Sequence, residues 1–315
     1  MSWRSWRAIA LGAVSGVALG AFPALQPTSR LPEVTFIPRT SGTIPTEAMH
    51  RGANRAARQA GFRLYWNAPT REDDVDRQIL LMSSALQNDT RGLILGPTNG
   101  LALTTKINEF VAHRIPIVVV QTDTPLPAGP YVTSVAPDQA EVSRLAAERI
   151  FRALPAGGEV AIVGLDRTAP ETLQRSQHFV NYMTSHPAVK IVAQQRGTSL
   201  VAEAEQNAGE VLDRFPRLKA LFAVSATATE GAILAIQQRG LGHSVVLVGC
   251  DDYLFMLSDL RAGKMDSLVI SDSEQMGYLA AKALLDAIQG RALPAPQHIA
   301  VRLVTRDNVD APGIR

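Results

Sequence analysis

Side chains that could do chemistry are scattered along this sequence in patterns that do not build a catalytic site. The six histidines have no metal-ligand spacing, and the nearest two, His178 and His186, straddle the end of an expected helix. The single cysteine, Cys250, follows an apolar strand pattern with no histidine placed to activate it, so we interpret it as a packed residue. No P-loop, dinucleotide-binding glycine fingerprint, HExxH or GxSxG motif follows residue 32. We therefore predict that the protein is not an enzyme and needs neither cofactor nor metal.

Two adjacent acidic pairs, Asp73-Asp74 and Asp251-Asp252, are the remaining chemical candidates. The first pair stands where a helix is expected to begin, and carboxylates there complement the helix dipole, so we interpret it as structural. Asp251 directly follows an apolar strand pattern. It could bind a ligand, or it could cap a helix expected to begin near Tyr253.

Composition excludes several classes of protein. The chain has 315 residues, and its 31 basic and 29 acidic side chains give a net charge of +2. This balance argues against nucleic acid as a partner, which requires a clustered basic patch. Hydrophobic residues make up 46% and charged residues 19%, as in a folded globular protein of one large or two ordinary domains. One cysteine excludes an internal disulfide framework and any cysteine-rich metal site.

Residues 1–24 are typical of a secretory signal peptide. Arg4 and Arg7 precede an apolar run, Ala8–Phe22, which is shorter than the roughly 20 residues that a membrane-spanning helix needs. Both candidate cleavage sites lack a small residue at their first position, so an uncleaved N-terminal anchor remains the alternative. No cysteine follows the run, which excludes a lipid anchor. We expect a periplasmic or secreted protein, or one anchored in the membrane by its leader.

After Pro32, short apolar runs alternate with longer helical patterns. Strands are predicted at Glu33–Ile37, Phe62–Trp66, Gly92–Gly96, Pro116–Val120, Glu159–Val163, Val189–Ala193, Ala220–Val224, Val245–Gly249, Ser267–Ile270 and Ile299–Val304. Helices are predicted at Glu47–Ala60 with Thr46 as cap, and at Asp73–Asn88, Leu101–His113, Asp138–Leu154, Glu171–Thr184, Val201–Arg214, Thr229–Arg239, Leu254–Ala262 and Glu274–Ile288. Strict alternation with short connections predicts a doubly wound α/β fold with right-handed crossovers.

The number of strands indicates two sheets of five or six strands each, because ten or eleven are many for one open sheet. The segment Thr122–Val135, rich in Pro, Gly and Thr, is the predicted junction. Two such lobes would hold a small ligand between them, at the carboxyl ends of their strands.

Six segments, taken in their order and spacing, carry a resemblance to a known family. They are Gly92–Leu103 (GLILGPTNGLAL), Ile115–Pro125 (IPIVVVQTDTP), Ala220–Gly240 (ALFAVSATATEGAILAIQQRG), Val245–Asp252 (VVLVGCDD), Ser267–Leu285 and Leu303–Val309. The chain resembles the periplasmic sugar-binding proteins of the ribose/galactose type, which share their fold with the effector core of the lactose-repressor family. The resemblance covers nearly all of residues 33–309. It implies the type I periplasmic binding protein fold: two doubly wound parallel-sheet lobes joined by a hinge.

The resemblance also implies an organisation and a function. We expect an N-terminal lobe of residues 33–136 plus 272–298 and a C-terminal lobe of residues 137–271 plus 299–315. The resemblance implies a monomeric, secreted solute-binding protein. It would capture a small polar ligand by hinge closure, with a sugar as the main candidate. It would deliver this ligand to an ABC-type permease. The alternative is a ligand-sensing module of the same fold for a membrane receptor or kinase, which an uncleaved leader would favour.

The resemblance implies that ligand-binding residues lie in loops at the strand ends. Carried over by position, they are Ser41, Thr43, Thr46, Gln121, Asp123, Arg175, Ser199, Ser225, Asp251 and Ser271. A carboxylate such as Asp251 accepts two hydroxyl protons and the guanidinium of Arg175 donates in a fork, which suits a sugar-like ligand. Other interpretations stay open: Arg175 could pair with Glu171 on a solvated helix face, and Asp123 could be a turn residue. Ser41, Thr43 and Ser225 could simply face solvent.

The sequence departs from the family pattern at several of these positions. The first loop lacks the aromatic residues that stack on a sugar ring, and Cys250 stands where an aromatic residue is expected before Asp251. Gln121 replaces an expected Asp, and Ser225-Ala226 replaces an Asn-Asp pair. These departures leave the identity of the ligand open, including whether it is a sugar.

Overall fold

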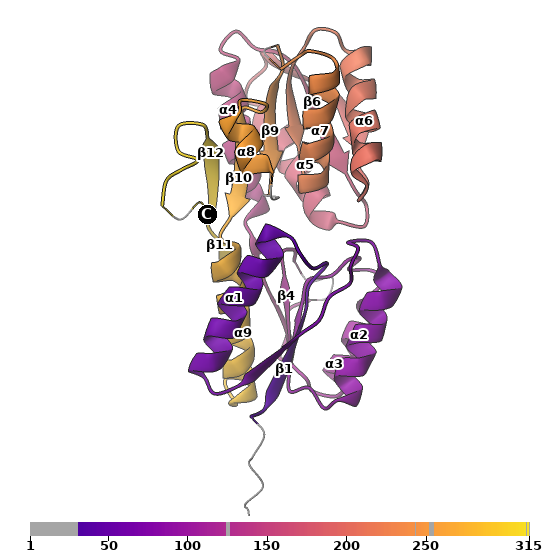
Figure 1. Ribbon diagram of the computed structural model, residues 1–315, viewed down its shortest axis with the longest axis vertical. Coiled ribbons are helices and arrows are strands. Elements are labelled where there is room, and N and C mark those ends of the chain that lie inside the picture. Colours follow the sequence, from indigo (N-terminus) through magenta and orange to yellow (C-terminus); the bar gives the residue numbers. More distant parts are fainter. Residues whose placement is uncertain (1–30, 124–126, 243, 252–254, 313, 315) are drawn as a thin grey trace, which may run out of the picture. The chain divides into compact units, whose positions relative to one another are not determined.

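The computed structural model describes residues 31–123, 127–242, 244–251, 255–312 and 314. The predicted leader, residues 1–24, lies outside the described residues, as does Asp252 of the second acidic pair. The described chain builds two α/β lobes, each with a six-stranded sheet at its centre (Figure 1).

The first lobe has an all-parallel sheet covered on both faces. Its strands, in spatial order, are β11 (Gln297–Ile299), β5 (Val132–Pro137), β4 (Ile117–Val120), β3 (Leu93–Leu95), β1 (Glu33–Ile37) and β2 (Arg63–Trp66). Helices α1 (Ile44–Gln59) and α9 (Ser273–Ile288) cover one face, and α2 (Val75–Gln87) and α3 (Thr104–Ala112) cover the other (Figure 1). Strand β1 serves both cores, since Val34 and Phe36 pack under α1 and α9 whereas Ile37 packs under α2 and α3. Such double burial explains the unbroken apolar runs.

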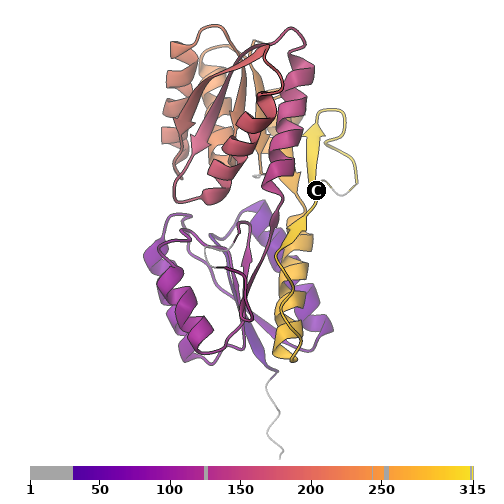
Figure 2. The same ribbon diagram turned by 180° about the vertical axis from the view of Figure 1, so that it is seen from behind.

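The second lobe repeats this plan with one antiparallel strand. Its order is β12 (Val301–Thr305), β10 (Ser267–Ser271), β9 (Val246–Cys250), β8 (Leu218–Ala223), β6 (Gly158–Leu165) and β7 (Val189–Arg196), and only β12 runs antiparallel, beside β10. Helices α4 (Gln139–Ala153) and α5 (Pro170–Met183) cover one face. Helices α6 (Val201–Arg214), α7 (Ala226–Gln238) and α8 (Met256–Arg261) cover the other (Figures 1 and 2).

Three predictions about individual elements need correction. Helix α1 begins at Ile44 and its cap is Thr43, whose hydroxyl accepts a hydrogen bond from the backbone N–H of Thr46; Pro45 fits because the first turn needs no N–H donor there. Thr122–Val135 is not simply a junction, because it contains the start of β5, which pairs with β4. The predicted strand Ile299–Val304 is two strands, β11 and β12, in different sheets.

The chain passes from one sheet to the other at three places. These passages lie between β5 and α4, between β10 and α9, and between β11 and β12 (Figure 2). The second passage returns α9 to the first lobe, where it packs tightly on α1. A methyl group on Gly277 would overlap the backbone carbonyl of Met49, and one on Gly52 would overlap that of Glu274, so glycine permits this close approach. None of the helices in the described part of the chain has the length and apolarity needed to cross a bilayer.

Candidate ligand-binding site

A polar pocket lies where the carboxyl ends of the two sheets face each other. It encloses about 130 Å³ and is lined by loops that follow β1, β4, β6, β8, β9 and β10. Ligands of open α/β sheets bind at these strand ends, so the topology itself directs the loops to one place. Residues of both lobes contribute to the lining, for example Arg39 and Gln121 from the first and Glu171 and Arg175 from the second.

Most of the residues named from the sequence come together in this pocket. Those that line it are Thr43, Thr46, Gln121, Arg175, Ser199, Ser225, Asp251 and Ser271. Ser41 and Asp123 are not part of the lining. Ser41 is exposed, with its backbone N–H bonded to the carbonyl of Pro69 at 3.2 Å, and Asp123 is half-buried. The pocket therefore gathers eight of the ten named positions.

Arg175 is the most completely buried charge in the pocket, with 3% of its side chain exposed. Its Nη1 donates to Asp251 Oδ2 at 2.8 Å and to the Val224 carbonyl at 2.9 Å, and its Nη2 donates to Asp251 Oδ1 at 3.3 Å. Its Nε donates to Gln139 Oε1 at 2.7 Å. Burial by itself would lower the pKa of Arg175, but the Asp251 carboxylate outweighs it, the net direction is upward, and the guanidinium is charged.

These contacts exclude two of the structural alternatives left open by the sequence. Arg175 is not on a solvated helix face, because it is buried and bonded to Asp251. Asp251 is not the cap of α8, because that helix begins at Met256 with Phe255 as its cap. Asp251 keeps 34% of its side chain exposed and has a left-handed backbone, with φ of 61°. Its carboxylate thus meets Arg175 on one side and remains accessible from the pocket.

Cys250, beside Asp251, is packed as predicted. The thiol is fully buried within the core under α4 and α5. Burial raises the pKa of Cys250 to about 12, and the nearby Arg175 offsets this only in part. The thiol is therefore protonated at neutral pH and has no nucleophilic role.

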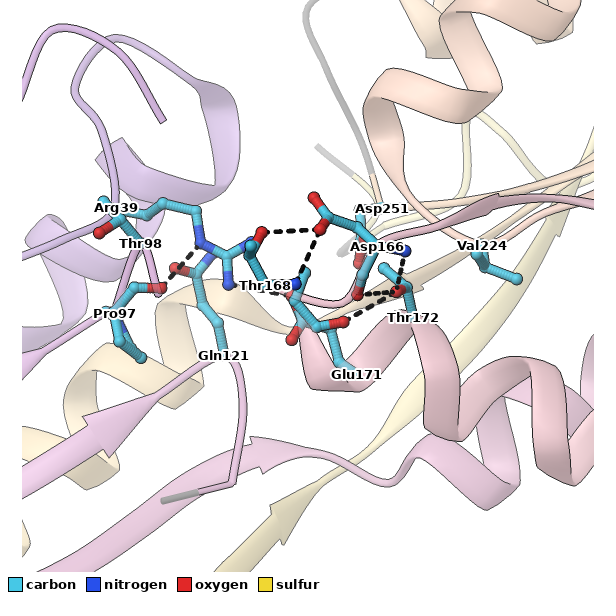
Figure 3. Close-up of polar contacts among 12 residues, drawn as sticks. Arg39, Pro97, Thr98, Gln121, Asp166, Thr168, Glu171, Thr172, Val224 and Asp251 are labelled. Atoms are coloured by element: carbon cyan, nitrogen blue, oxygen red, sulfur yellow. Dashed lines mark hydrogen bonds and ion pairs between the residues drawn. The ribbon is translucent and has the colours of Figure 1, made fainter. Parts of the chain in front are cut away.

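A second ion pair in the pocket, Arg39 with Glu171, was not predicted from the sequence. Arg39 follows β1 in the first lobe, and Glu171 lies in the first turn of α5 in the second. Arg39 Nη2 donates to Glu171 Oε1 at 2.9 Å, and Arg39 Nε donates to the Pro97 carbonyl at 3.1 Å (Figure 3). Burial would raise the pKa of Glu171, but Arg39, the residue's own backbone N–H and Arg175 together hold it below its usual range. Glu171 is therefore ionised at neutral pH.

A fully buried glutamine positions the first-lobe side of the pocket. Gln78 Nε2 donates to the carbonyls of Pro38 at 3.1 Å and Gly96 at 2.8 Å. Its Oε1 accepts from the backbone N–H and the hydroxyl of Thr98, at 2.8 and 3.0 Å. Gln78 thereby fixes the loops that carry Arg39 and Thr98. This role of Gln78 could not be predicted from the sequence, because a glutamine in a helix ordinarily faces solvent.

Several short polar residues in the lining already have structural partners. Ser225 caps α7, its Oγ accepting from the Ala228 N–H at 3.2 Å. The hydroxyls of Thr43 and Thr46 lie 2.6 Å apart at the start of α1. The interpretation of Asp73-Asp74 as structural is right for Asp74, which caps α2, whereas Asp73 lines the pocket.

The described part of the pocket lining is acidic. It contains five carboxylates and two guanidinium groups: Glu72, Asp73, Asp166, Glu171 and Asp251 with Arg39 and Arg175. No aromatic side chain occurs among the described residues that line it. Within residues 31–123 and the other described ranges, no group of three or more potential ligands is arranged to hold a metal ion. The arrangement can bind a small polar molecule through hydrogen bonds and charge.

Comparison with known proteins agrees with this geometry. The D-ribose/D-allose-binding protein of Pseudomonas aeruginosa is 26% identical over 245 residues, which cover 75% of this chain and 74% of that protein. The ribose import binding protein of Bacillus subtilis is 22% identical over 259 residues, 82% of each chain. The periplasmic component of an ABC-type sugar transport system from Hahella chejuensis has a TM-score of 0.81 and 27% identity, over 87% of this chain and 100% of that one.

The family is shown by the extent of the match. Residues 34–292 match the model of the periplasmic binding protein domain, which spans both lobes and every described residue of the pocket lining. The resemblance and the type I fold predicted from the sequence are thereby confirmed. The chain belongs to the periplasmic binding protein family.

Proposed function

We propose that the protein captures a small polar ligand, a sugar or close sugar analogue, and delivers it to an ABC-type importer. The observation that carries this proposal is the enclosed pocket at the carboxyl ends of both sheets, with the buried Arg175–Asp251 pair in its wall. A cavity of roughly 150 Å³ accommodates one six-membered ring. A pocket of about 130 Å³ therefore has room for a single sugar ring. The sugar-binding names of the relatives support the same ligand class.

The Arg175–Asp251 pair supplies the chemistry of recognition. Four of the five N–H groups of Arg175 are used by Gln139, Val224 and Asp251, which leaves one on Nη2 for a ligand oxygen. Asp251, being partly exposed, has acceptor capacity for ligand hydroxyl groups. Both groups are held in place before the ligand arrives, which lowers the entropic cost of binding. Binding makes or breaks no covalent bond, so the protein acts as a carrier and not as an enzyme.

Capture would proceed by movement of the two lobes about the three chain passages. We propose residues 33–136 plus 272–298 and residues 137–271 plus 299–315 as the two moving bodies. A ligand that contacts both lobes binds their closed arrangement more tightly than the open one. The difference between these two binding free energies is the amount by which the ligand stabilises the closed arrangement. The closed form is the one that a permease would recognise. Export to the periplasm, with the leader removed or kept as an anchor, is the location that fits such a role.

A ligand screen tests the proposal directly. Purified protein is heated with D-ribose, D-allose, D-arabinose, D-glucose, D-galactose and simple polyols, and the unfolding midpoint is recorded. A ligand at 100 times its dissociation constant stabilises the native state by about 2.7 kcal/mol, an easily measured shift. The bound molecule, released by denaturation and examined by mass spectrometry, should be unchanged. Failure of the entire panel to raise the midpoint would contradict the proposal, and a converted ligand would indicate an enzyme.

A further inference from the structure

One carboxylate oxygen in the pocket lacks a partner. Glu171 Oε1 accepts from Arg39, whereas Glu171 Oε2 is buried without a hydrogen-bond partner among the described residues. Only 8% of the Glu171 side chain is exposed, and the residue lines the pocket (Figure 3). A buried polar atom that makes no hydrogen bond is unfavourable, and an ionised carboxylate can only accept. The missing partner is therefore a hydrogen-bond donor.

The first lobe contributes a second acceptor of the same kind. Gln121 lies at the carboxyl end of β4, and its Oε1 is also buried and lacks a hydrogen-bond partner in the described part of the chain. Gln121 has a left-handed backbone, with φ of 72°, which a non-glycine residue rarely adopts. The two unsatisfied atoms in the lining are thus both acceptors, one from each lobe. A ligand that satisfies them presents donors on both sides.

The described lining of the pocket holds more carboxylates than guanidinium groups. Its arginines form the pairs Arg39 with Glu171 and Arg175 with Asp251, and Arg71, outside the lining, pairs with Asp73. Asp166 has no ion pair with a basic side chain within the described ranges; its Oδ1 accepts from the N–H and the hydroxyl of Thr168, at 2.8 and 2.7 Å. The hydroxyl of Thr172, next to Glu171, bonds to the backbone of Asp166 and ties it to α5 (Figure 3). The described lining therefore carries excess negative charge.

We infer that Glu171 is a ligand-binding residue and that the pocket selects a sugar or polyol carrying a protonated amine, which donates to Glu171 Oε2. This inference rests on the proposed function and specifies its ligand. An ammonium group offers three donors and one positive charge, so it satisfies Oε2 and offsets the excess negative charge of the lining. A sugar acid or sugar phosphate would meet like charge from the acidic lining, so neither should bind.

The test uses two sets of sugars that share one ring and differ in charge. They are D-glucose, D-glucosamine and D-glucuronate, and D-galactose, D-galactosamine and D-galacturonate. Dissociation constants at pH 7 are measured by calorimetry for the full chain. We expect the amino sugar of at least one set to bind about tenfold or more tightly than its neutral partner, since a hydrogen bond to a charged group has at least this effect. Neither acid should bind.

Two variants each remove one carboxylate charge from the pocket lining, and a third is the control. Glu171→Gln keeps the shape but removes the charge, and Asp166→Asn keeps an acceptor for Thr168. Each should reduce the preference for the amino over the neutral sugar about tenfold. Glu159→Gln is the matched control, because Glu159 lies at the amino end of β6 in the same lobe and pairs with Arg217 at the same 2.9 Å. It should leave all affinities unchanged.

The outcomes separate this inference from the proposed function. If neutral sugars bind as tightly as amino sugars and Glu171→Gln and Asp166→Asn change nothing, the inference is wrong and the proposed function stands. Binding of either uronate at the affinity of its neutral partner would also overturn the inference. If none of the six sugars binds and D-ribose and D-allose fail as well, the proposed function falls with it. Should Glu171→Gln fail to fold, Asp166→Asn decides alone, since Thr168 is the only partner of the Asp166 side chain among the described residues.

Discussion

Replacement of Arg175 by methionine tests whether the buried guanidinium supports the fold as well as the ligand. Methionine keeps the apolar stem and removes the charge and its four hydrogen bonds. The Val224 carbonyl and Gln139 Oε1 are then buried without donors, at about 1–3 kcal/mol each. The Asp251 side chain is 34% exposed and can hydrogen-bond to water in the variant, so it contributes less to the loss of stability. Breaking a buried ion pair in this way costs about 3–5 kcal/mol in total.

The predicted loss is large enough to measure in the absence of any ligand. For a protein of this size about 3–5 kcal/mol corresponds to a decrease of roughly 10 °C in the unfolding midpoint. Urea unfolding followed by circular dichroism gives the free energy directly. The control is Arg144→Met on the surface of α4, which removes three hydrogen bonds to Glu141 and Glu148 from a side chain that is 42% exposed. Exposed pairs of this kind contribute about 1 kcal/mol or less.

The comparison of Arg175→Met with Arg144→Met can also contradict the prediction. If Arg175→Met unfolds within about 1 kcal/mol of Arg144→Met, the Arg175–Asp251 pair does not stabilise the unliganded protein and its role is confined to the ligand. Arg175→Lys should fall between the two, because an ammonium keeps the charge without the planar fork that reaches Asp251, Val224 and Gln139 together.

Three further predictions concern packing and titration. Gly277→Ala should lower the free energy of unfolding in urea by about 1–3 kcal/mol, because the added methyl group meets the backbone of α1. Gly242→Ala should leave this free energy nearly unchanged, because the space around Gly242 is open. Equal losses in the two variants would contradict the close packing of α1 and α9. Cys250, with its pKa raised to about 12, should resist a thiol reagent at pH 8 until the protein unfolds, and rapid labelling would refute its burial. Burial lowers the pKa of His50 despite the nearby Glu47, and the imidazole stacks on Trp66 at 4.1 Å. The native state therefore binds the His50 proton more weakly, so this contribution to stability is complete above pH 6.5 and is lost as the pH falls below it. In His50→Gln, the urea concentration at the unfolding midpoint should decrease less between pH 7 and pH 5 than in the unmodified protein. An unchanged decrease would contradict the role given to His50.

The order and type of most elements could be predicted from the sequence because burial on both sheet faces imposes a clear pattern. Runs such as Ile117–Val120 are apolar throughout, and helices such as α6 keep one apolar face. Strand β5 was missed because Thr133 and Ser134 make it look like a loop. Both residues are buried, and the Thr133 hydroxyl donates to the Pro294 carbonyl at 2.8 Å, a partner that only the folded chain supplies.

The site was predictable where it depends on strand ends and hidden where it depends on the tertiary arrangement. Asp251 and Gln121 directly follow apolar strands, so their place in a loop at the sheet edge is visible in the sequence. Arg39 and Glu171 are 132 residues apart and meet only because two lobes face each other. The orphaned oxygen of Glu171 likewise becomes apparent only when its burial is known. Local spacing contains no information about either feature.

The return of α9 to the first lobe has a consequence for how the molecule is made. Met276, Ala280 and Leu284 of α9 fill the core beneath β1 and β4, and β11 completes the edge of that sheet. During synthesis, β6 to β10 of the second lobe therefore leave the ribosome before α9 and β11, which complete the first lobe. Until about residue 299 has emerged, the first lobe exposes an apolar sheet face to solvent and chaperones. A chain truncated after Pro137 should remain incompletely packed, although it contains five of the six strands of its sheet.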